Sequence, residues 1–244
     1  MIGQNNQGFF ATGKTAETTT GAIAKTFMAS VFLWMTLAMV ITAVTAYWFA
    51  SDQALIGSLV NFETGSMSTL GWFVMLAPLG FVLLMSFGYQ KLSPAIMTLL
   101  FIAFAVLIGM SLSFILIVYT ATSVYQTFAI TAGMFGIMAV TGYTTKTDLT
   151  KFGSIMFMGL IGIIIAMVVN FFLQSSALEY LISVIGVLVF TGLTAYDVQK
   201  LKRIGSQSMD AGTTRKMAIM GALTLYLDFI NLFLFLLRLL GDRR

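Results

Sequence analysis

The 244-residue chain contains no cysteine, no histidine and only two prolines. The absence of cysteine excludes disulfides, thiolate nucleophiles and thiolate metal sites. The absence of histidine excludes histidine metal sites, Ser-His-Asp hydrolysis and the usual switch near neutral pH. Any response to pH must therefore depend on carboxyl groups.

Charge is also scarce, because only 9% of the residues are charged whereas 59% are hydrophobic. A soluble domain carries about 25% charged residues. Several apolar runs exceed the roughly 18 residues that a membrane-spanning helix needs. The composition predicts an all-α integral membrane protein with one polytopic domain in contact with the lipid bilayer.

Seven apolar segments follow one another with short connections, so consecutive helices should be antiparallel neighbours. Residues 1–25 are polar and predict a flexible N-terminal tail, while residues 26–244 predict one transmembrane domain. The first apolar run is too long for a cleaved signal peptide. The predicted spans are residues 27–50, 70–87, 95–118, 124–143, 153–173, 178–199 and 216–240.

The basic residues lie in short loops between the spans, which favours a topology signal over a nucleic-acid site for the net charge of +4. The positive-inside rule then predicts a cytoplasmic N-terminus. The cytoplasmic segments would hold Lys14, Lys25, Lys91, Lys146, Lys151, Lys200, Lys202, Arg203, Arg215 and Lys216. The outer loops would hold no lysine or arginine, and their charged residues would be the acidic Asp52, Glu63 and Glu179.

The C-terminal arginines disagree with this pattern. After seven full spans, Arg238, Arg243 and Arg244 would emerge outside the cytoplasm. The length of residues 216–240 favours a full span. The alternative is a re-entrant last segment that returns the arginines to the cytoplasm.

Two aspartates interrupt the last two apolar segments. Asp197 lies near the end of the sixth segment and Asp228 lies in the middle of the seventh. A carboxylate inside a bilayer costs roughly 3 kcal/mol on insertion scales and usually marks an ion or proton path. Each aspartate shares one face of its helix with other residues at helical spacing, most of them polar or small, and we call each such face a seam. The seam of the sixth segment holds Ser183, Gly186, Phe190, Thr194 and Asp197. The seam of the seventh segment holds Met217, Gly221, Thr224, Asp228, Asn231, Phe235 and Arg238.

These two seams should face protein and pair with each other, which makes the seventh segment central. Asp197 and Asp228 would then share a proton, because two adjacent carboxylates in a low dielectric cannot both ionise cheaply. The supporting polar residues would be Thr194, Tyr196, Thr224, Tyr226 and Asn231.

An alternative for Asp197 is a position at the cytoplasmic interface, where it would pair with Lys200 or Lys202. The two aspartates also differ in their distance from the flanking lysines, by roughly 10 Å in depth at 1.5 Å per residue. Only staggered or tilted helices would bring them together.

Four stretches resemble the Bax inhibitor family, also called the transmembrane Bax-inhibitor-motif family, and its bacterial branch is the more similar one. They are TGLTAYDVQKLK at residues 191–202, GYTTKTDLTKFGS at 142–154, MGLIGIIIAMVVNFFLQSS at 158–176 and LYLDFINLFLFLLRLLG at 225–241. The resemblance implies seven transmembrane helices, with six in two three-helix layers around a central seventh helix. It also implies residence in a bacterial cytoplasmic (inner) membrane.

The resemblance further implies a calcium leak that is gated by pH through the aspartates matching Asp197 and Asp228. Both would make transient contacts with Ca²⁺, which prefers hard oxygen ligands. Ca²⁺ would be the transported ion, and no cofactor is expected. Residues 70–87 contain no lysine or arginine, although some calcium-leak members place a partner for the sixth-helix aspartate there.

Two other classes of function remain open. Intramembrane aspartyl proteases also begin with a Tyr-Asp pair, like Tyr196 and Asp197, but Leu225, Tyr226 and Leu227 supply bulk before Asp228 where such proteases need glycines. The chain is therefore not expected to be an enzyme. A regulatory membrane protein, acting through a membrane protease or other membrane proteins, is the second alternative.

Overall fold

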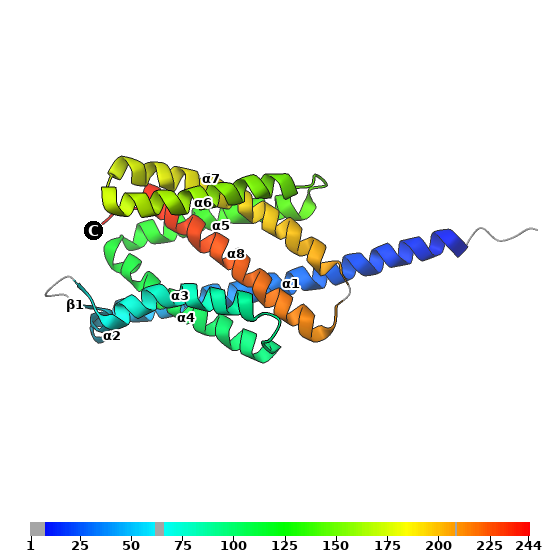
Figure 1. Cartoon of the computed structure of the whole chain (residues 1–244), viewed down its shortest axis with the longest axis horizontal. Coiled ribbons are helices and arrows are strands. Elements are labelled where there is room, and N and C mark those ends of the chain that lie inside the picture. Colours follow the sequence, from blue (N-terminus) through cyan, green and yellow to red (C-terminus); the bar gives the residue numbers. More distant parts are fainter. Residues whose placement is uncertain (1–7, 62–65, 208) are drawn as a thin grey trace, which may run out of the picture.

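The computed structural model describes residues 8–61, 66–207 and 209–244, and for residues 8–20 it describes only the backbone. These ranges contain eight helices and one short hairpin (Figure 1). The helices are α1 (Gly8–Ser51), α2 (Gln53–Leu59), α3 (Thr69–Gly88), α4 (Pro94–Val118), α5 (Ala121–Thr144), α6 (Thr150–Leu173), α7 (Ser176–Gly205) and α8 (Ala211–Leu240), and the hairpin strands are β1 (Val60–Asn61) and β2 (Ser66–Met67).

Seven of these helices are long and apolar enough to cross a membrane. The prediction of an all-α membrane protein with seven spans is confirmed, and each predicted segment lies inside one helix. The short helix α2 and the hairpin were not predicted. Both α7 and α8 continue past their predicted limits, because lysine and arginine can extend their stems along a helix while their charges reach water.

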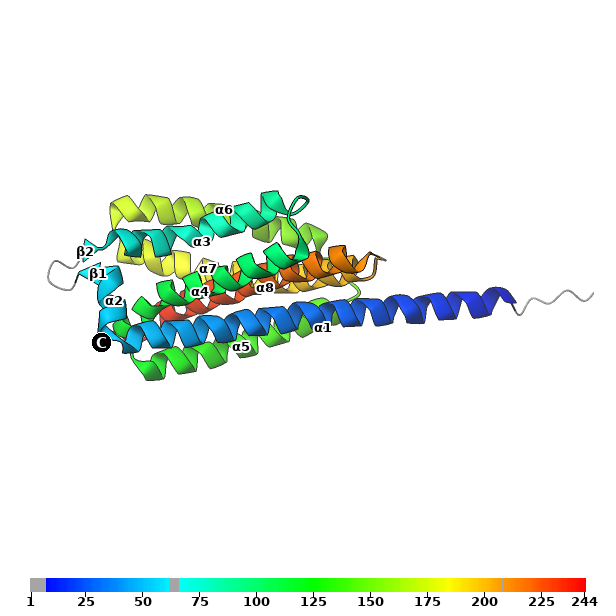
Figure 2. The ribbon, with the colours of Figure 1, turned by 90° about the horizontal axis from the view of Figure 1, so that it is seen from below.

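Helix α1 begins at Gly8, within the stretch that was predicted to be a tail. Its first turns extend beyond the other helices (Figure 2). Residues 1–7 lie outside the described part of the chain. The mobility of the tail and the division at residue 25 stay predictions.

Local chemistry explains where the spans begin. The side chains of Ser68, Ser93, Thr120 and Ser175 each accept a hydrogen bond from a backbone N–H in the first turn of the helix that follows. Asp210 does the same for α8 through the N–H of Thr213. Such caps satisfy N–H groups that have no partner within the helix.

Helix α8 is the most buried span and packs against α1, α4, α5 and α7. It crosses the bundle obliquely (Figure 1). Helix α3 packs on α4, and α6 packs on α7 with most of its own surface exposed. The predicted grouping of the other six spans into two three-helix layers stays a prediction.

The two ends of the bundle differ in charge. The basic end carries the loops after α3, α5 and α7, with Lys91, Lys146, Lys202, Arg203, Arg215 and Lys216. The opposite end carries α2, the hairpin and the C-terminus (Figure 1). There the N–H of Arg244 donates to the carbonyl of Val118, and the N–H of Thr120 donates to the carbonyl of Asp242.

The 30-residue helix α8, about 45 Å long, therefore runs the full length from the basic end to the opposite end. A continuous helix of this length agrees with the preferred full span, and the side of the membrane on which the arginines lie stays a prediction. The C-terminal arginines are held by neighbouring groups at the opposite end, where Arg243 lies 3.9 Å from Glu179.

Candidate functional site

Helices α7 and α8 pack antiparallel along the two polar seams. The Phe235 ring of α8 lies against Gly186 and 5.8 Å from the Phe190 ring of α7, measured between ring centroids. Nearer the basic end, Leu201 of α7 packs against Gly221 of α8. This register places Asp197 and Asp228 between the two contacts.

The carboxyl groups of Asp197 and Asp228 lie within hydrogen-bonding reach of each other. The difference in depth suggested by the sequence is thus overcome, since α8 crosses the bundle obliquely (Figure 1). The structure brings together the two residues that the sequence singled out.

Asp228 is the more deeply buried of the two, with 5% of its surface exposed. Its Oδ2 atom has no hydrogen-bond partner within the described residues. A buried polar atom without a partner is costly, and one that persists points to a proton, a water or an ion that it receives in function. Asp197 interacts with Asp228 by charge and by hydrogen bonding, so the protonation of Asp228 depends on the state of that neighbour.

Asp197 is partly buried and also feels the positive charge of Lys200, one turn further along α7. Among the residues that the structure describes, no lysine or arginine lies within ion-pair distance of Asp197. The Lys202 ammonium instead donates to the carbonyl of Tyr143. Asp197 therefore faces its partner aspartate and lies near the basic end at the same time.

The side chains of three predicted supporting residues donate hydrogen bonds to backbone carbonyls of their own helices. Thr194 donates to the carbonyl of Phe190, Thr224 to that of Met220 and Asn231 to that of Leu227. Their side-chain oxygens remain as acceptors. They line the same seams as the aspartates, and within the described part of the chain none of them hydrogen-bonds to an aspartate.

The two tyrosines point to other helices. Tyr196 packs its ring against Gly153 of α6, with the Lys200 ammonium 5.8 Å from the ring centroid. Tyr226 is completely buried, and its hydroxyl lies 2.7 Å from the Thr42 hydroxyl of α1. In the part of the chain that the structure covers, neither tyrosine hydrogen-bonds to an aspartate.

Thr42 is a site residue that the sequence analysis missed. Its hydroxyl donates to the carbonyl of Ala105 in α4, so Tyr226 donates to Thr42 and a buried chain joins α8, α1 and α4. A threonine in an apolar helix is common, and only its packing opposite Tyr226 makes it distinctive.

A second missed feature is a clasp between α7 and the loop that joins α5 to α6. The Gln199 side chain accepts from the N–H of Leu149 and donates to the carbonyl of Thr147. Arg203 donates to Asp148 and to the Gln199 side-chain oxygen. Hydrogen bonds from Thr150 and Arg203 hold the pKa of Asp148 well below its usual range. The clasp begins two residues after Asp197.

The aspartate pair offers limited coordination to a metal ion. Within the described ranges no three acidic side chains come together. Ca²⁺ takes six to eight oxygen ligands, so two carboxyl groups and nearby hydroxyl or amide oxygens form an incomplete shell. The geometry suits a brief contact better than tight storage.

Comparison with known proteins places the chain in a family. The family described as "Inhibitor of apoptosis-promoting Bax1" matches residues 24–244. The inner membrane protein YbhL of Escherichia coli is 50% identical over 222 residues, which cover 90% of this chain and 93% of that protein. Uncharacterized proteins of Borreliella burgdorferi and Rickettsia prowazekii are 46% and 44% identical, over 91% and 89% of this chain and 94% and 90% of their own lengths.

Proposed function

Because the chain belongs to the Bax inhibitor family, we propose that it is a pH-sensitive calcium or cation leak channel of a bacterial inner membrane, gated by Asp197 and Asp228. The N-terminus lies in the cytoplasm in this proposal, and the protein transports ions rather than catalysing a reaction. Its integral membrane character follows from the seven apolar helices.

One observation carries the proposal: two carboxyl groups from neighbouring spans meet inside the bundle, and one oxygen of Asp228 has no hydrogen-bond partner among the described residues. While the carboxyl groups share a proton, they attract each other and the α7–α8 seam stays packed. Loss of that proton leaves two negative charges in contact at low dielectric, which favours separation of the helices.

Separation would open a path lined by oxygen atoms. A cation entering the seam would find the carboxylates, together with the acceptor oxygens of Thr194, Thr224 and Asn231. A change in protonation can shift the population of such an open state only if the two states bind the proton differently. The shared proton supplies that difference.

Calcium flux into liposomes tests the proposal. We expect Asp228→Asn to abolish the dependence of flux on pH between about pH 5 and pH 8, because the amide does not titrate. Asp197→Asn should have the same effect. Asp52→Asn is the matched control, since Asp52 is an exposed helix cap at the opposite end and asparagine caps equally well.

Flux with an unchanged pH profile in both Asp197→Asn and Asp228→Asn would remove the pair from the mechanism. Absence of calcium flux in the wild-type protein would remove the leak itself.

The extension of α1 beyond the bundle favours regulation through a membrane protease or another membrane protein as a second candidate function (Figure 2). Deletion of residues 1–20 separates the two candidates. A regulatory protein should lose its effect on its partner in the cell while the truncated chain keeps the calcium flux of the wild type.

A further inference from the structure

A cavity of about 540 Å³ opens at the basic end, between α1, the α5–α6 loop and the last turns of α7. Its volume falls within the roughly 300–1,000 Å³ that is usual for small-ligand sites. Gly21 lines it without a side chain, and no atom lies within 4 Å of the position that a Cβ would take there. The walls come from three separate parts of the chain, so the cavity is a product of the fold.

Three basic side chains, Lys146, Lys202 and Arg203, line this cavity against one acidic side chain, Asp148. Arg203 is already paired with Asp148. Lys146 and Lys202 form no ion pair with any residue that the structure describes. Among the side chains that the structure describes, these two positive charges at the cavity are therefore uncompensated.

Lys202 is fixed in place. Its ammonium donates to the carbonyl of Tyr143 over 2.8 Å and lies 4.6 Å from the centroid of the Tyr143 ring. These contacts use one of its three donors and hold the charge at the cavity wall. A preorganised ammonium binds an anion at a lower entropic cost than a mobile one.

The cavity also lies at the level where the spans end. Thr145 follows the last residue of α5, and Lys202 and Arg203 lie in the last turn of α7. Phospholipid phosphates lie at this depth, and basic pockets between transmembrane helices bind anionic headgroups.

We propose that this cavity binds a phosphate group, with Lys146 and Lys202 as its charged ligands. The phosphate belongs either to the headgroup of an anionic phospholipid or to a soluble phosphorylated anion. Binding does not require that the protein conduct ions, so the inference stands apart from the proposed leak.

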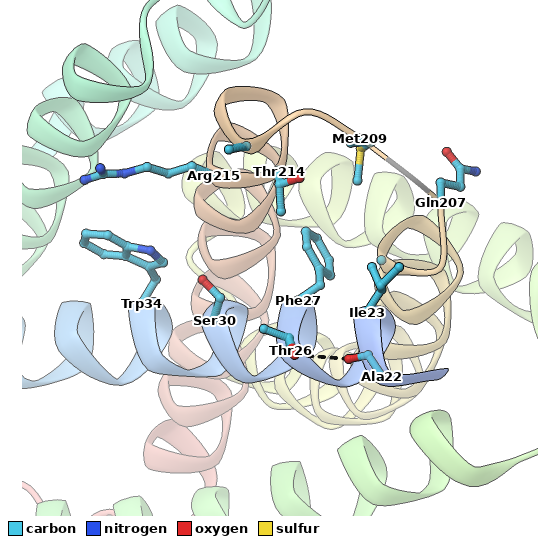
Figure 3. Close-up of a pocket in the computed structure, with 12 residues that line it drawn as sticks. Ala22, Ile23, Thr26, Phe27, Ser30, Trp34, Gln207, Met209, Thr214 and Arg215 are labelled. Carbon is cyan, nitrogen blue, oxygen red and sulfur yellow. Dashed lines mark hydrogen bonds between the residues drawn. The ribbon is translucent and has the colours of Figure 1, made fainter. Parts of the chain in front are cut away.

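A second cavity, between α1 and the connection from α7 to α8, supplies an internal comparison (Figure 3). Its volume is about 690 Å³, and its single charged lining residue is Arg215. The Arg215 guanidinium lies above the Trp34 ring and donates to the Thr98 hydroxyl. Removal of this charge lowers the net charge of the same end of the bundle but leaves the proposed site intact.

Native mass spectrometry of the full chain in detergent tests the proposal. The protein is presented with an equimolar mixture of phosphatidylglycerol and phosphatidylcholine, and separately with inorganic phosphate. We expect Lys146→Gln and Lys202→Gln each to weaken binding of the anion about tenfold, the loss typical of one charge-assisted hydrogen bond. Arg215→Gln and Lys200→Gln should bind as the wild type does.

Lys146 is exposed, so Lys146→Gln tests the site even if the loss of the Lys202 contacts disturbs folding. A phosphatidylglycerol preference that these two variants remove identifies a lipid headgroup. Binding of inorganic phosphate that the same variants remove identifies a soluble anion. No preference for either anion, or an equal loss in Arg215→Gln, overturns the proposal.

Discussion

The buried chain of hydroxyl groups from Tyr226 through Thr42 to the Ala105 carbonyl shows how single polar side chains tie spans together. Lipid supplies no hydrophobic drive between helices, so packing and hydrogen bonds must hold them. The Tyr226 ring also packs edge-on against Phe104, with ring centroids 5.7 Å apart. Tyr226 therefore connects α8 to both α1 and α4.

Tyr226→Phe should destabilise the protein by about 0.5–1.5 kcal/mol, because it removes one hydrogen bond and keeps the ring. Tyr226→Ala should cost several times more, about 3–5 kcal/mol, since the ring is lost from a tight core. Thermal unfolding in detergent measures both. Tyr125→Phe is the control, because the exposed Tyr125 should be insensitive; an equal loss there would contradict the assignment.

Asp148 gives a prediction about pH at the clasp. Its pKa is lowered in the folded protein by hydrogen bonds from Thr150 and Arg203. A lowered folded pKa means that the contact is fully present above the unfolded value of about 3.9 and is lost only as the pH falls through the folded pKa. The clasp should stay closed across the physiological range.

Hydrogen exchange at the Leu149 amide, which donates to Gln199, reports on the clasp. We expect its protection, corrected for intrinsic exchange, to stay constant between about pH 5 and pH 8. Asp148→Asn should lower that protection at every pH and should leave any midpoint of calcium flux unchanged. A flux midpoint that moves in Asp148→Asn would place the sensor at the clasp rather than at the aspartate pair.

At the scale of elements, the α7–α8 contact depends on small residues opposite large ones. A Cβ atom at Gly186 would lie 2.6 Å from a carbon of the Phe235 ring, which is closer than atoms can approach. The close contact at Gly186 and the contact at Gly221 define the register that aligns the aspartates. The proposed site therefore depends on the close packing of α7 against α8 at these two glycines.

Gly186→Ala should destabilise the protein by about 1–3 kcal/mol through overpacking. Gly136→Ala in α5 is the matched control, because no atom lies within 4 Å of the added methyl group and alanine favours the helix. The double variant Gly186→Ala with Phe235→Leu should recover part of the loss. Unfolding of the wild type, Gly186→Ala, Phe235→Leu and the double variant measures the coupling between the two positions. Equal effects of Gly186→Ala and Gly136→Ala would contradict the packing argument.

Two lysines near the basic end each connect one helix to the end of another. Lys202 of α7 donates to the carbonyl of Tyr143 at the end of α5, and Lys216 of α8 donates to the carbonyl of Tyr89 at the end of α3. Each ammonium also lies over the ring of the tyrosine it contacts, at 4.6 and 4.8 Å from the centroid. A positive charge at the carboxyl end of a helix is favourable. These contacts join the loop between α7 and α8 to the rest of the basic end.

At the scale of the whole molecule, the two ends of the bundle predict orientation. We expect the basic end, with Gln207, to face the cytoplasm and the C-terminal Arg244 to face the other side. The chain has no cysteine, so Gln207→Cys and Arg244→Cys each introduce a unique thiol.

A membrane-impermeant maleimide applied to right-side-out vesicles should label Arg244→Cys at once and Gln207→Cys only after permeabilisation. The opposite pattern would reverse the orientation. Labelling of both positions from one side would contradict the full span of α8.

The site residues that could be predicted are those that stand out within their own helix, by residue type or by helical spacing. Asp228 is exceptional in any apolar helix, and helical spacing placed Gly186 and Asp197 on one face without knowledge of a partner. Thr42, Gln199 and Asp148 carried no such signal, because their importance depends on what packs opposite them. Tyr196 and Tyr226 share the segments of the aspartates but contact α6, α1 and α4, since rotation about a helix axis separates neighbours in sequence.

The amino-acid sequence by itself determined that the chain spans a membrane seven times, because the free energy of placing a helix in lipid depends on about 20 consecutive side chains. Only the tertiary structure decided which polar groups meet. Thr42 and Tyr226 are 184 positions apart, and Gln199 and Leu149 are 50 apart. Such pairs depend on the tilt and rotation of whole helices, which packing against several neighbours determines at once.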